Sequence, residues 1–156
     1  MDSIDLRILG LLQADATLSL AAIADRVGLS QTPCWKRVRR LEEDGVITGR
    51  VALLDPKKVG VPVTVFASIR TNRHDPIWLA AFADGVAQLP EVVEVYRMSG
   101  QTDYLLKIVC PDIAGYDAVY RQLIEIVDIH DVSSAFAMEE LKATTALPLR
   151  HAAIIA

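Results

Sequence analysis

The chain has few of the residues that mark secreted, metal-binding or membrane proteins. Its only two cysteines, Cys34 and Cys110, lie in different segments without metal-ligand neighbours, which favours a reduced cytosolic protein. The three histidines are scattered without ligand spacing. No apolar run is long enough to span a bilayer, and the acidic start Met-Asp-Ser-Ile-Asp does not suggest a secretory signal. We therefore expect a cytoplasmic protein with no metal, no cofactor and no membrane contact.

Sequence signatures of catalysis are absent as well. The chain has no Gly-x-Ser-x-Gly turn, no phosphate-binding loop and no nucleophile with a nearby base. With 52% apolar residues and a mean hydropathy of +0.30, it is nevertheless too apolar to be disordered. We expect a folded protein that is not an enzyme, so its function has to be sought in binding surfaces.

The net charge of −4 at first argues against nucleic-acid binding, but the charges are unevenly distributed. Residues 1–60 carry nine Lys or Arg and eight Asp or Glu, whereas the remainder carries seven and twelve. Within residues 26–41 there are five cations and no acid. A local positive potential of this kind is what matters for contact with phosphate.

Two short amphipathic helices are predicted near the N-terminus. Apolar residues at helical spacing predict a helix over residues 3–13, with Asp2 and Asp5 placing acceptors and negative charge at its start. The same periodicity predicts a second helix over residues 20–27, and Ser19 is in position to be its N-cap.

The third predicted helix is basic and follows a tight turn at Gly28. Ser30 should cap this helix, and because Pro33 removes the N–H group of the third helical position, Ser30 should bond the amide of Thr32 instead. Gly45 should end the helix, as glycine commonly does.

Three helices followed by a β-hairpin wing over residues 46–53 are typical of a winged helix-turn-helix. Such a fold places its third helix in the major groove, with the uncharged first turn at base edges and the cations at phosphates. Gln31 and Thr32 should therefore read bases, while arginines hold the backbone. The residues expected at DNA are Ser30, Gln31, Thr32, Lys36, Arg37, Arg39, Arg40 and Arg50. The alternative is a basic helix face that only contacts water.

A change of pattern divides the chain into two domains. Residues 54–62 hold two prolines, a glycine and a charged pair, which predicts a linker between a DNA-binding domain at 1–53 and a second domain at 63–156. In the second domain, strands are expected at 63–70, 92–98, 103–109 and 132–143, and helices at 76–89 and 113–127.

This βαββαβ order predicts a ferredoxin-like sandwich, so the chain as a whole is an α+β protein. A four-stranded antiparallel sheet with both helices on one face leaves the other face open. That open face has apolar positions, so a second subunit should cover it.

Two motifs make the chain resemble the Lrp/AsnC family of bacterial and archaeal transcriptional regulators over essentially its full length. One is Ser30-x-Thr32-Pro33-Cys34 at the start of the third helix, and the other is Ser99-Gly100-x-x-Asp103-Tyr104 in the second domain. The resemblance implies a regulator that binds double-stranded DNA and responds to an amino acid. It also implies homodimers formed through the sheets, and octamers of four such dimers with the amino acid bound between dimers.

The resemblance places the effector at the loop between the second and third strands. Its backbone N–H groups could hold a carboxylate, and Asp103 could pair with an ammonium group. Where many family members have an acidic and an aromatic residue, this chain has Gln101 and Thr102, from which we expect an apolar, branched-chain amino acid. The expected contacts are Ser99, Gly100, Gln101, Thr102, Asp103 and Tyr104, with Ser133 and Ser134 as weaker candidates. The alternative is that Gly100 supplies the turn and Asp103 caps it.

Two other functions stay open on the sequence alone. The ferredoxin-like fold hosts enzymes, although no catalytic signature supports one here. An architectural protein could bind DNA without responding to any ligand. The intact Gly-x-x-Asp loop favours the ligand-responsive regulator over that alternative.

Overall fold

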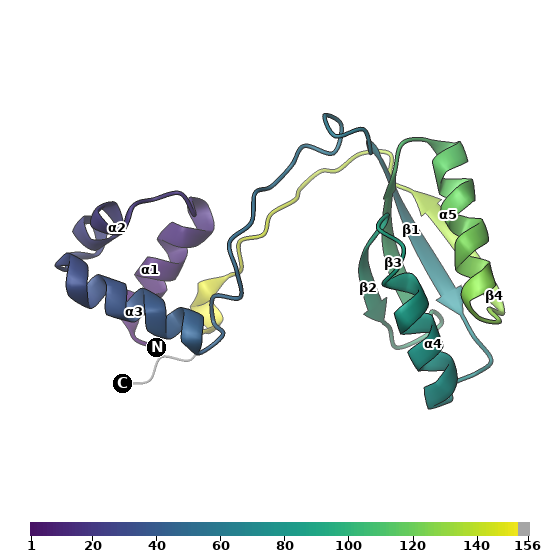
Figure 1. Ribbon diagram of the computed structural model, residues 1–156, viewed down its shortest axis with the longest axis horizontal. Coiled ribbons are helices and arrows are strands. Elements are labelled where there is room, and N and C mark those ends of the chain that lie inside the picture. Colours follow the sequence, from purple (N-terminus) through teal and green to yellow (C-terminus); the bar gives the residue numbers. More distant parts are fainter. Residues whose placement is uncertain (153–156) are drawn as a thin grey trace. The chain divides into compact units, whose positions relative to one another are not determined.

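The structure, a computed structural model, describes residues 1–152 and divides the chain into two units (Figure 1). The first unit comprises Met1–Ala52 together with residues 142–152, and the second comprises Leu53–Leu141. Residues 142–156 were expected in the second domain. The described part of that segment belongs instead with the first unit, because Leu149 packs against its core. Among residues 1–152, no helix is long and apolar enough to cross a membrane.

Three helices make up most of the first unit: α1 (Ser3–Ala14), α2 (Leu20–Val27) and α3 (Gln31–Glu43). Their apolar faces meet in one core of fully or nearly fully buried side chains. The core residues are Ile8, Leu9, Ile23, Ala24, Val27, Cys34, Val38 and Leu41. Gly28 adopts a φ of +74°, which makes the tight turn between α2 and α3. The expected helix-turn-helix is therefore present.

The first two helices begin as the sequence predicts. Asp2 Oδ1 accepts the N–H groups of Ile4 and Asp5, both at 2.9 Å, and the Asp5 carboxylate accepts the N–H of Asp2 in return. This is a capping box, which satisfies amides that have no helical partner. Ser19 Oγ accepts the N–H of Ala22 at 3.2 Å at the start of α2.

The end of the third helix agrees with the prediction, but its start does not. The predicted bond from Ser30 to the Thr32 amide is wrong, since the Ser30 side chain makes no capping hydrogen bond. Ser30 is exposed, so water can satisfy both the hydroxyl and the amide. At the other end, Gly45 has a φ of +70°, and the N–H of Val46 reaches the Leu41 carbonyl at 2.9 Å. These are features of a Schellman motif.

The predicted β-hairpin wing over residues 46–53 is also wrong, because no strand forms there. The N–H groups of Val46 and Ile47 both bond the Leu41 carbonyl, so they are not available to pair with a second strand. Ile47 packs against the core of the unit, and the chain then leaves as an exposed segment towards the second unit.

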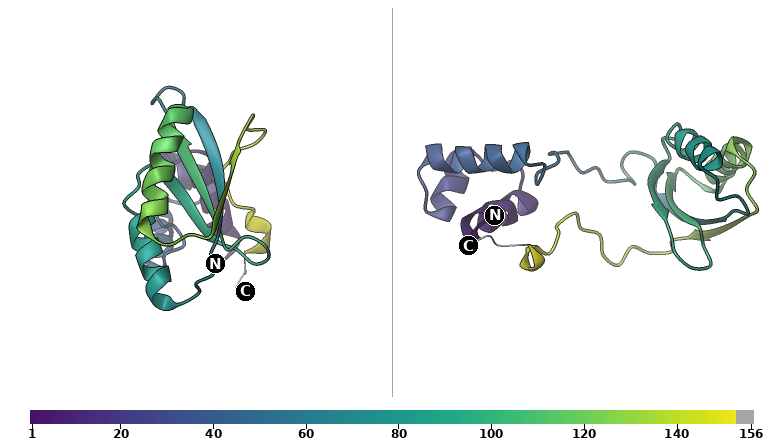
Figure 2. Two further views of the ribbon diagram at one scale, coloured as in Figure 1. Left: turned by 90° about the vertical axis from the view of Figure 1, so that its right-hand side faces the viewer. Right: turned by 90° about the horizontal axis from the view of Figure 1, so that it is seen from below.

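The second unit is the expected ferredoxin-like sandwich. It contains β1 (Val63–Arg70), α4 (Pro76–Val86), β2 (Val92–Arg97), β3 (Tyr104–Cys110), α5 (Ile113–Ile126) and β4 (Asp131–Phe136). The strands form one antiparallel sheet in the order β2-β3-β1-β4. Both helices cover the same face of this sheet (Figures 1 and 2). In the core, the ring of Trp78 stacks on that of Phe82, and the ring of Tyr104 lies tilted against Phe82.

The last strand is shorter than predicted, since β4 ends at Phe136 rather than continuing to residue 143. It pairs only with β1, and the final bond runs from the Ala137 N–H to the Thr64 carbonyl at 2.9 Å. Because β1 begins at Val63, after Pro62, there is no strand beyond it with which residues 138–143 could pair.

The face of the sheet opposite the helices carries apolar side chains, as expected. Phe66, Leu105 and Val109 lie on it by strand register, together with Tyr96 from the edge strand β2. Phe66 is 38% exposed and Tyr96 is 50% exposed. Lys107 also lies on this face and pairs with Glu94 at 3.1 Å.

Candidate nucleic-acid interface and effector loop

The first turn of α3 presents polar side chains to solvent. Ser30, Gln31 and Thr32 are all exposed, and Lys36 is exposed one turn further along. The opposite face of the helix is anchored in the core, where burial raises the pKa of the Cys34 thiol. The helix therefore has one buried apolar face and one accessible polar face, as a helix that docks in a DNA groove requires.

Arg37, expected at a phosphate, is only partly exposed and binds the start of α1. Its Nη1 lies 2.6 Å from Asp2 Oδ2 and 2.7 Å from Asp5 Oδ1. The Asp5 side chain is only 1% exposed and that of Arg37 25%, so the pair lies largely out of water. The hydrogen bonds that Arg37 donates to Asp5, and then to Asp2, raise the pKa of Arg37. This cation therefore joins α3 to α1.

The buried carboxylate of Asp5 organises this part of the unit, a role that sequence reasoning missed. Besides Arg37, it accepts a hydrogen bond from Arg40 Nη2 at 2.6 Å. Arg40 is half exposed, so part of its charge remains available to DNA. Arg37 and Arg40 are three positions apart on one helix, and side chains at that spacing lie on one face. This spacing in the sequence could have indicated that Arg37 and Arg40 share one acidic partner.

The remaining predicted phosphate contacts form exposed ion pairs. Arg39 lies 3.1 Å from Glu43, with its guanidinium 6.0 Å from the centre of the Trp35 ring. Arg50 lies 2.8 Å from Glu42 on α3. Exposed pairs of this kind contribute little to stability, so a phosphate can replace the glutamate. Lys36 has no ion-pair partner within residues 1–152.

Asp103 has a structural role in the loop between β2 and β3. Its Oδ2 accepts the N–H of Thr71 at 2.8 Å, and its own N–H donates to the Ile69 carbonyl at 2.9 Å. Asp103 thus ties this loop to the chain that follows β1, which is the capping alternative weighed from the sequence. Gly100 has a φ of +114°, a conformation that other residues rarely adopt.

The other predicted effector residues are not all brought to one place. Ser99 and Gln101 are exposed and Thr102 is half-buried, but Tyr104 is buried, with its ring 4.9 Å from that of Phe82. Ser133 lies opposite Ser68 on the open face of the sheet, as strand register shows. Ser134 lies on the helix face, where its hydroxyl bonds the Tyr116 hydroxyl. The two serines therefore point to opposite faces and do not form a pair.

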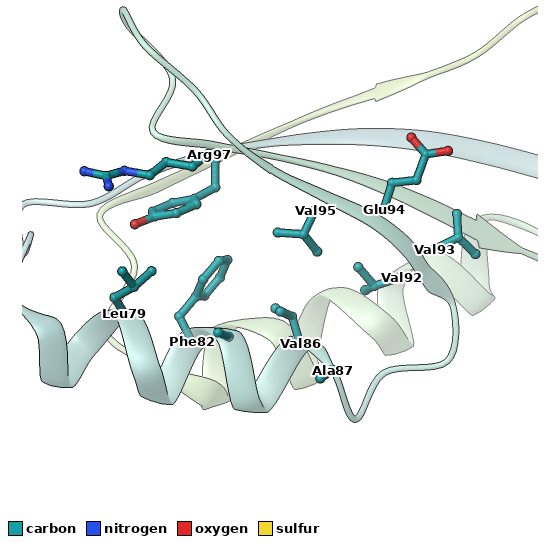
Figure 3. A pocket seen from close by; sticks show the side chains of 11 residues that line it. Leu79, Phe82, Val86, Ala87, Val92, Val93, Glu94, Val95 and Arg97 are labelled. Carbon is teal, nitrogen blue, oxygen red and sulfur yellow. The ribbon is translucent and has the colours of Figure 1, made fainter. Parts of the chain in front are cut away.

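An apolar groove beside this loop was not predicted. It has a volume of about 320 Å³ and lies between α4 and the edge strand β2. Leu79 and Phe82 of α4 face Val95 across it, and Arg97 lies at one end (Figure 3). The groove depends on how a helix packs beside an edge strand, so spacing along the chain offered no signal for it.

A helix-turn-helix unit joined to an α/β sandwich defines a DNA-binding regulator with a separate regulatory domain. Residues 1–48 match a family described as winged helix-turn-helix DNA-binding, and residues 64–147 match the Lrp/AsnC ligand binding domain. The chain belongs to the Lrp/AsnC family of transcriptional regulators.

Similar proteins cover the chain almost completely. It is 47% identical over 150 residues to the DNA-binding transcriptional activator DecR of Escherichia coli, covering 96% of this chain and 99% of that one. An AsnC family transcriptional regulator from Agrobacterium tumefaciens shares 60% identity and a TM-score of 0.92, covering 96% of this chain and 97% of that one. A transcriptional regulator from Neisseria meningitidis, solved in complex with L-Met, shares 33% identity and a TM-score of 0.92, covering 97% and 98%. These relatives are regulators rather than enzymes, which agrees with the expectation from sequence.

Proposed function

We propose that this DNA-binding regulator responds to a small-molecule effector, an amino acid, and that it acts in the cytoplasm as a homodimer or a homo-octamer. The observation that carries the proposal is the match of residues 64–147 to a ligand-binding domain, combined with a Gly-x-x-Asp loop whose glycine has a positive φ. The L-Met complex of the Neisseria relative supports an amino acid as the class of ligand.

At the DNA, the exposed first turn of α3 contacts base edges. Gln31 and Thr32 have the donors and acceptors needed for this, and neither is engaged in a side-chain hydrogen bond within residues 1–152. Lys36, Arg39 and Arg50 contact phosphates, with Arg40 contributing its exposed part. Arg37 is left out of this set because Asp2 and Asp5 already compensate its charge.

At the effector loop, Asp103 pairs with the ammonium group of the ligand through its second carboxylate oxygen, since Oδ2 already accepts the N–H of Thr71. The neighbouring groove offers apolar walls for an aliphatic side chain. Ser99, Gln101 and Thr102 line the loop around the ligand. An apolar amino acid suits this combination of one charged group and an aliphatic surface.

The test is a calorimetric screen of the twenty amino acids against the full chain, followed by titration of Asp103→Asn. Asparagine keeps an acceptor for the Thr71 N–H and removes only the charge, whereas alanine would leave the amide of the buried Thr71 without its partner. We expect Asp103→Asn to fold normally, to bind DNA and to lose amino-acid affinity. Undiminished affinity would place the ligand elsewhere, and no binding by any amino acid would favour the architectural alternative.

The open face of the sheet is the surface through which we propose that two subunits pair. Phe66, Leu105 and Val109 would be buried there, and a second copy of the same face is apolar in the same way. Phe66→Glu should dissociate the dimer, whereas Ile77→Glu, a change at an exposed residue of α4, should not. Sedimentation at micromolar concentration distinguishes these outcomes, and a monomeric wild-type chain would contradict the proposal.

A further inference from the structure

The C-terminal segment of the chain docks on the first helix of the DNA-binding unit. The side-chain amide of Gln13, in the last turn of α1, makes two hydrogen bonds with the backbone of Leu147. The Leu147 N–H donates to Gln13 Oε1 at 2.6 Å, and Gln13 Nε2 donates to the Leu147 carbonyl at 3.2 Å. Two residues further on, Leu149 is half-buried against the apolar core of the unit.

Leu147 and Leu149 bind the first unit in different ways. Leu147 contributes only its backbone, since its side chain is 73% exposed. Leu149 contributes its side chain, which lies over Gly10 of α1. A Cβ added at Gly10 would lie 3.9 Å from Leu149 Cδ1, which is ordinary contact, so a methyl group fits there and a larger side chain would take the place of Leu149.

This docking gives the DNA-binding unit a second connection to the rest of the chain. One connection, residues 48–62, leaves after Ile47 at the end of α3 and leads to β1. The other, residues 137–146, runs from the end of β4 to the segment docked on α1. A unit held by one flexible connection can turn through many orientations, and closing a second connection removes part of that freedom.

We propose that residues 147–149 act as a latch that restricts the orientation of the DNA-binding unit relative to β4, and so favours simultaneous contact with two half-sites. The contact consists of two hydrogen bonds and one half-buried leucine, so it opens more readily than the core. Any change at β4 that pulls on residues 137–146 alters the fraction of molecules in which the latch is closed. The inference uses the dimer proposed above but does not depend on the identity of the effector.

Trypsin cleavage reports the state of the latch in the full chain. Arg150 follows the docked leucine directly, whereas Lys142 lies in the exposed connection before it and serves as an internal reference. We expect Leu149→Ala to raise the rate of cleavage after Arg150 several-fold relative to cleavage after Lys142. Gln13→Ala should do the same, and the matched control Leu147→Ala should not, because its backbone bonds are retained.

DNA binding then reports the function of the latch. The protein first selects a DNA site with two half-sites from a random pool, and a shorter DNA that holds only one half-site is made from it. Each variant is then titrated with both the longer and the shorter DNA. Leu149→Ala and Gln13→Ala should bind the longer DNA about tenfold more weakly, equivalent to about 1.4 kcal/mol, and the single half-site within about twofold of wild type.

Three results would overturn the latch. Cleavage after Arg150 that Leu149→Ala leaves unchanged would show that the segment is not held by this side chain. Faster cleavage with unchanged affinity for the longer DNA would show docking without influence on DNA binding. Equal losses on both DNA lengths would show that Leu149 acts only by stabilising the three helices. If the wild-type chain proves monomeric, the paired-site preference is lost with the dimer, which sedimentation detects separately.

Discussion

Replacing Arg37 with alanine tests whether this cation holds the fold or the DNA. Both alternatives arise because Arg37 lies in the middle of the basic helix, where a phosphate contact is expected, but binds Asp2 and Asp5 in the structure. If Arg37 contacts phosphate, its replacement lowers DNA affinity without lowering the stability of the fold. If Arg37 forms a structural ion pair, its replacement lowers the stability of the fold, and DNA binding falls only because the protein unfolds.

The structure allows the size of the effect to be worked out. Hydrogen bonds to charged groups contribute about 1.5–3 kcal/mol each, and removing one partner of a buried pair can cost about 3–5 kcal/mol. After Arg37→Ala, Asp5 Oδ2 keeps its donors Arg40 and the Asp2 N–H, while Oδ1 loses its guanidinium. Because Arg37 is a quarter exposed and Asp5 keeps Arg40, we expect a loss of about 2–3 kcal/mol. In a small domain this lowers Tm by roughly 10–20 °C.

The assay pairs thermal unfolding with DNA titration at several salt concentrations, and Arg39→Ala is the matched control. Arg39 lies on the same helix in an exposed pair, so its replacement should change stability by less than about 0.5 kcal/mol. It should also reduce the slope of log K against log salt by about one unit. The reasoning is refuted if Arg37→Ala melts like wild type and reduces the salt slope as Arg39→Ala does.

Three further predictions follow from other parts of the first unit. Gln31→Ala should change sequence preference at one base pair by about 1–3 kcal/mol, measured by competition among DNA variants, while keeping the salt slope; unchanged preference would mean that Gln31 does not read bases. Gly45→Ala should lower stability by about 1 kcal/mol in thermal unfolding, because the φ of +70° disfavours a side chain; an unchanged Tm would contradict this. Hydrogen bonds from the Asp5 N–H, and then from Arg37, lower the pKa of Asp2. The stability that Asp2 contributes is therefore present above its unfolded pKa of about 4, and it is lost as the pH falls through the lower folded pKa. Asp2→Asn should therefore make Tm less dependent on pH below about 4, and an unaltered dependence would show that Asp2 is not responsible.

Local patterns in the sequence were sufficient to predict most of the secondary structure. Helical spacing of apolar residues predicted α1, α2 and α3, and the residues at their boundaries explain where two of them begin. Alternation predicted the strands of the second unit, and their order predicted the sandwich. These features depend on residues within a few positions of each other, whose physical effects can be judged without knowing the rest of the fold.

The candidate sites were predictable only in part. The exposed first turn of α3 agrees with the prediction, and the positive φ of Gly100 agrees with its expected place in a turn, because both follow from local turn and helix chemistry. The ion pair between Arg37 and Asp5 was not predicted, because the sequence pattern of a basic residue on a helix is the same whether it faces DNA or a buried carboxylate. The alternation of side chains along β4 separated Ser133 from Ser134, although their adjacency had suggested a common role.

The sequence by itself determined most of the helices and strands, because those preferences act between neighbours along the chain. Only the tertiary structure decided which distant groups meet. Asp5 and Arg37 are 32 positions apart, and Gln13 and Leu147 are 134 apart. The same applies to β4, which stops at Phe136 because its partner strand starts at Val63. Each of these contacts requires the chain to close a long loop, so its energy depends on the packing that brings the partners together and not on any pattern near either residue.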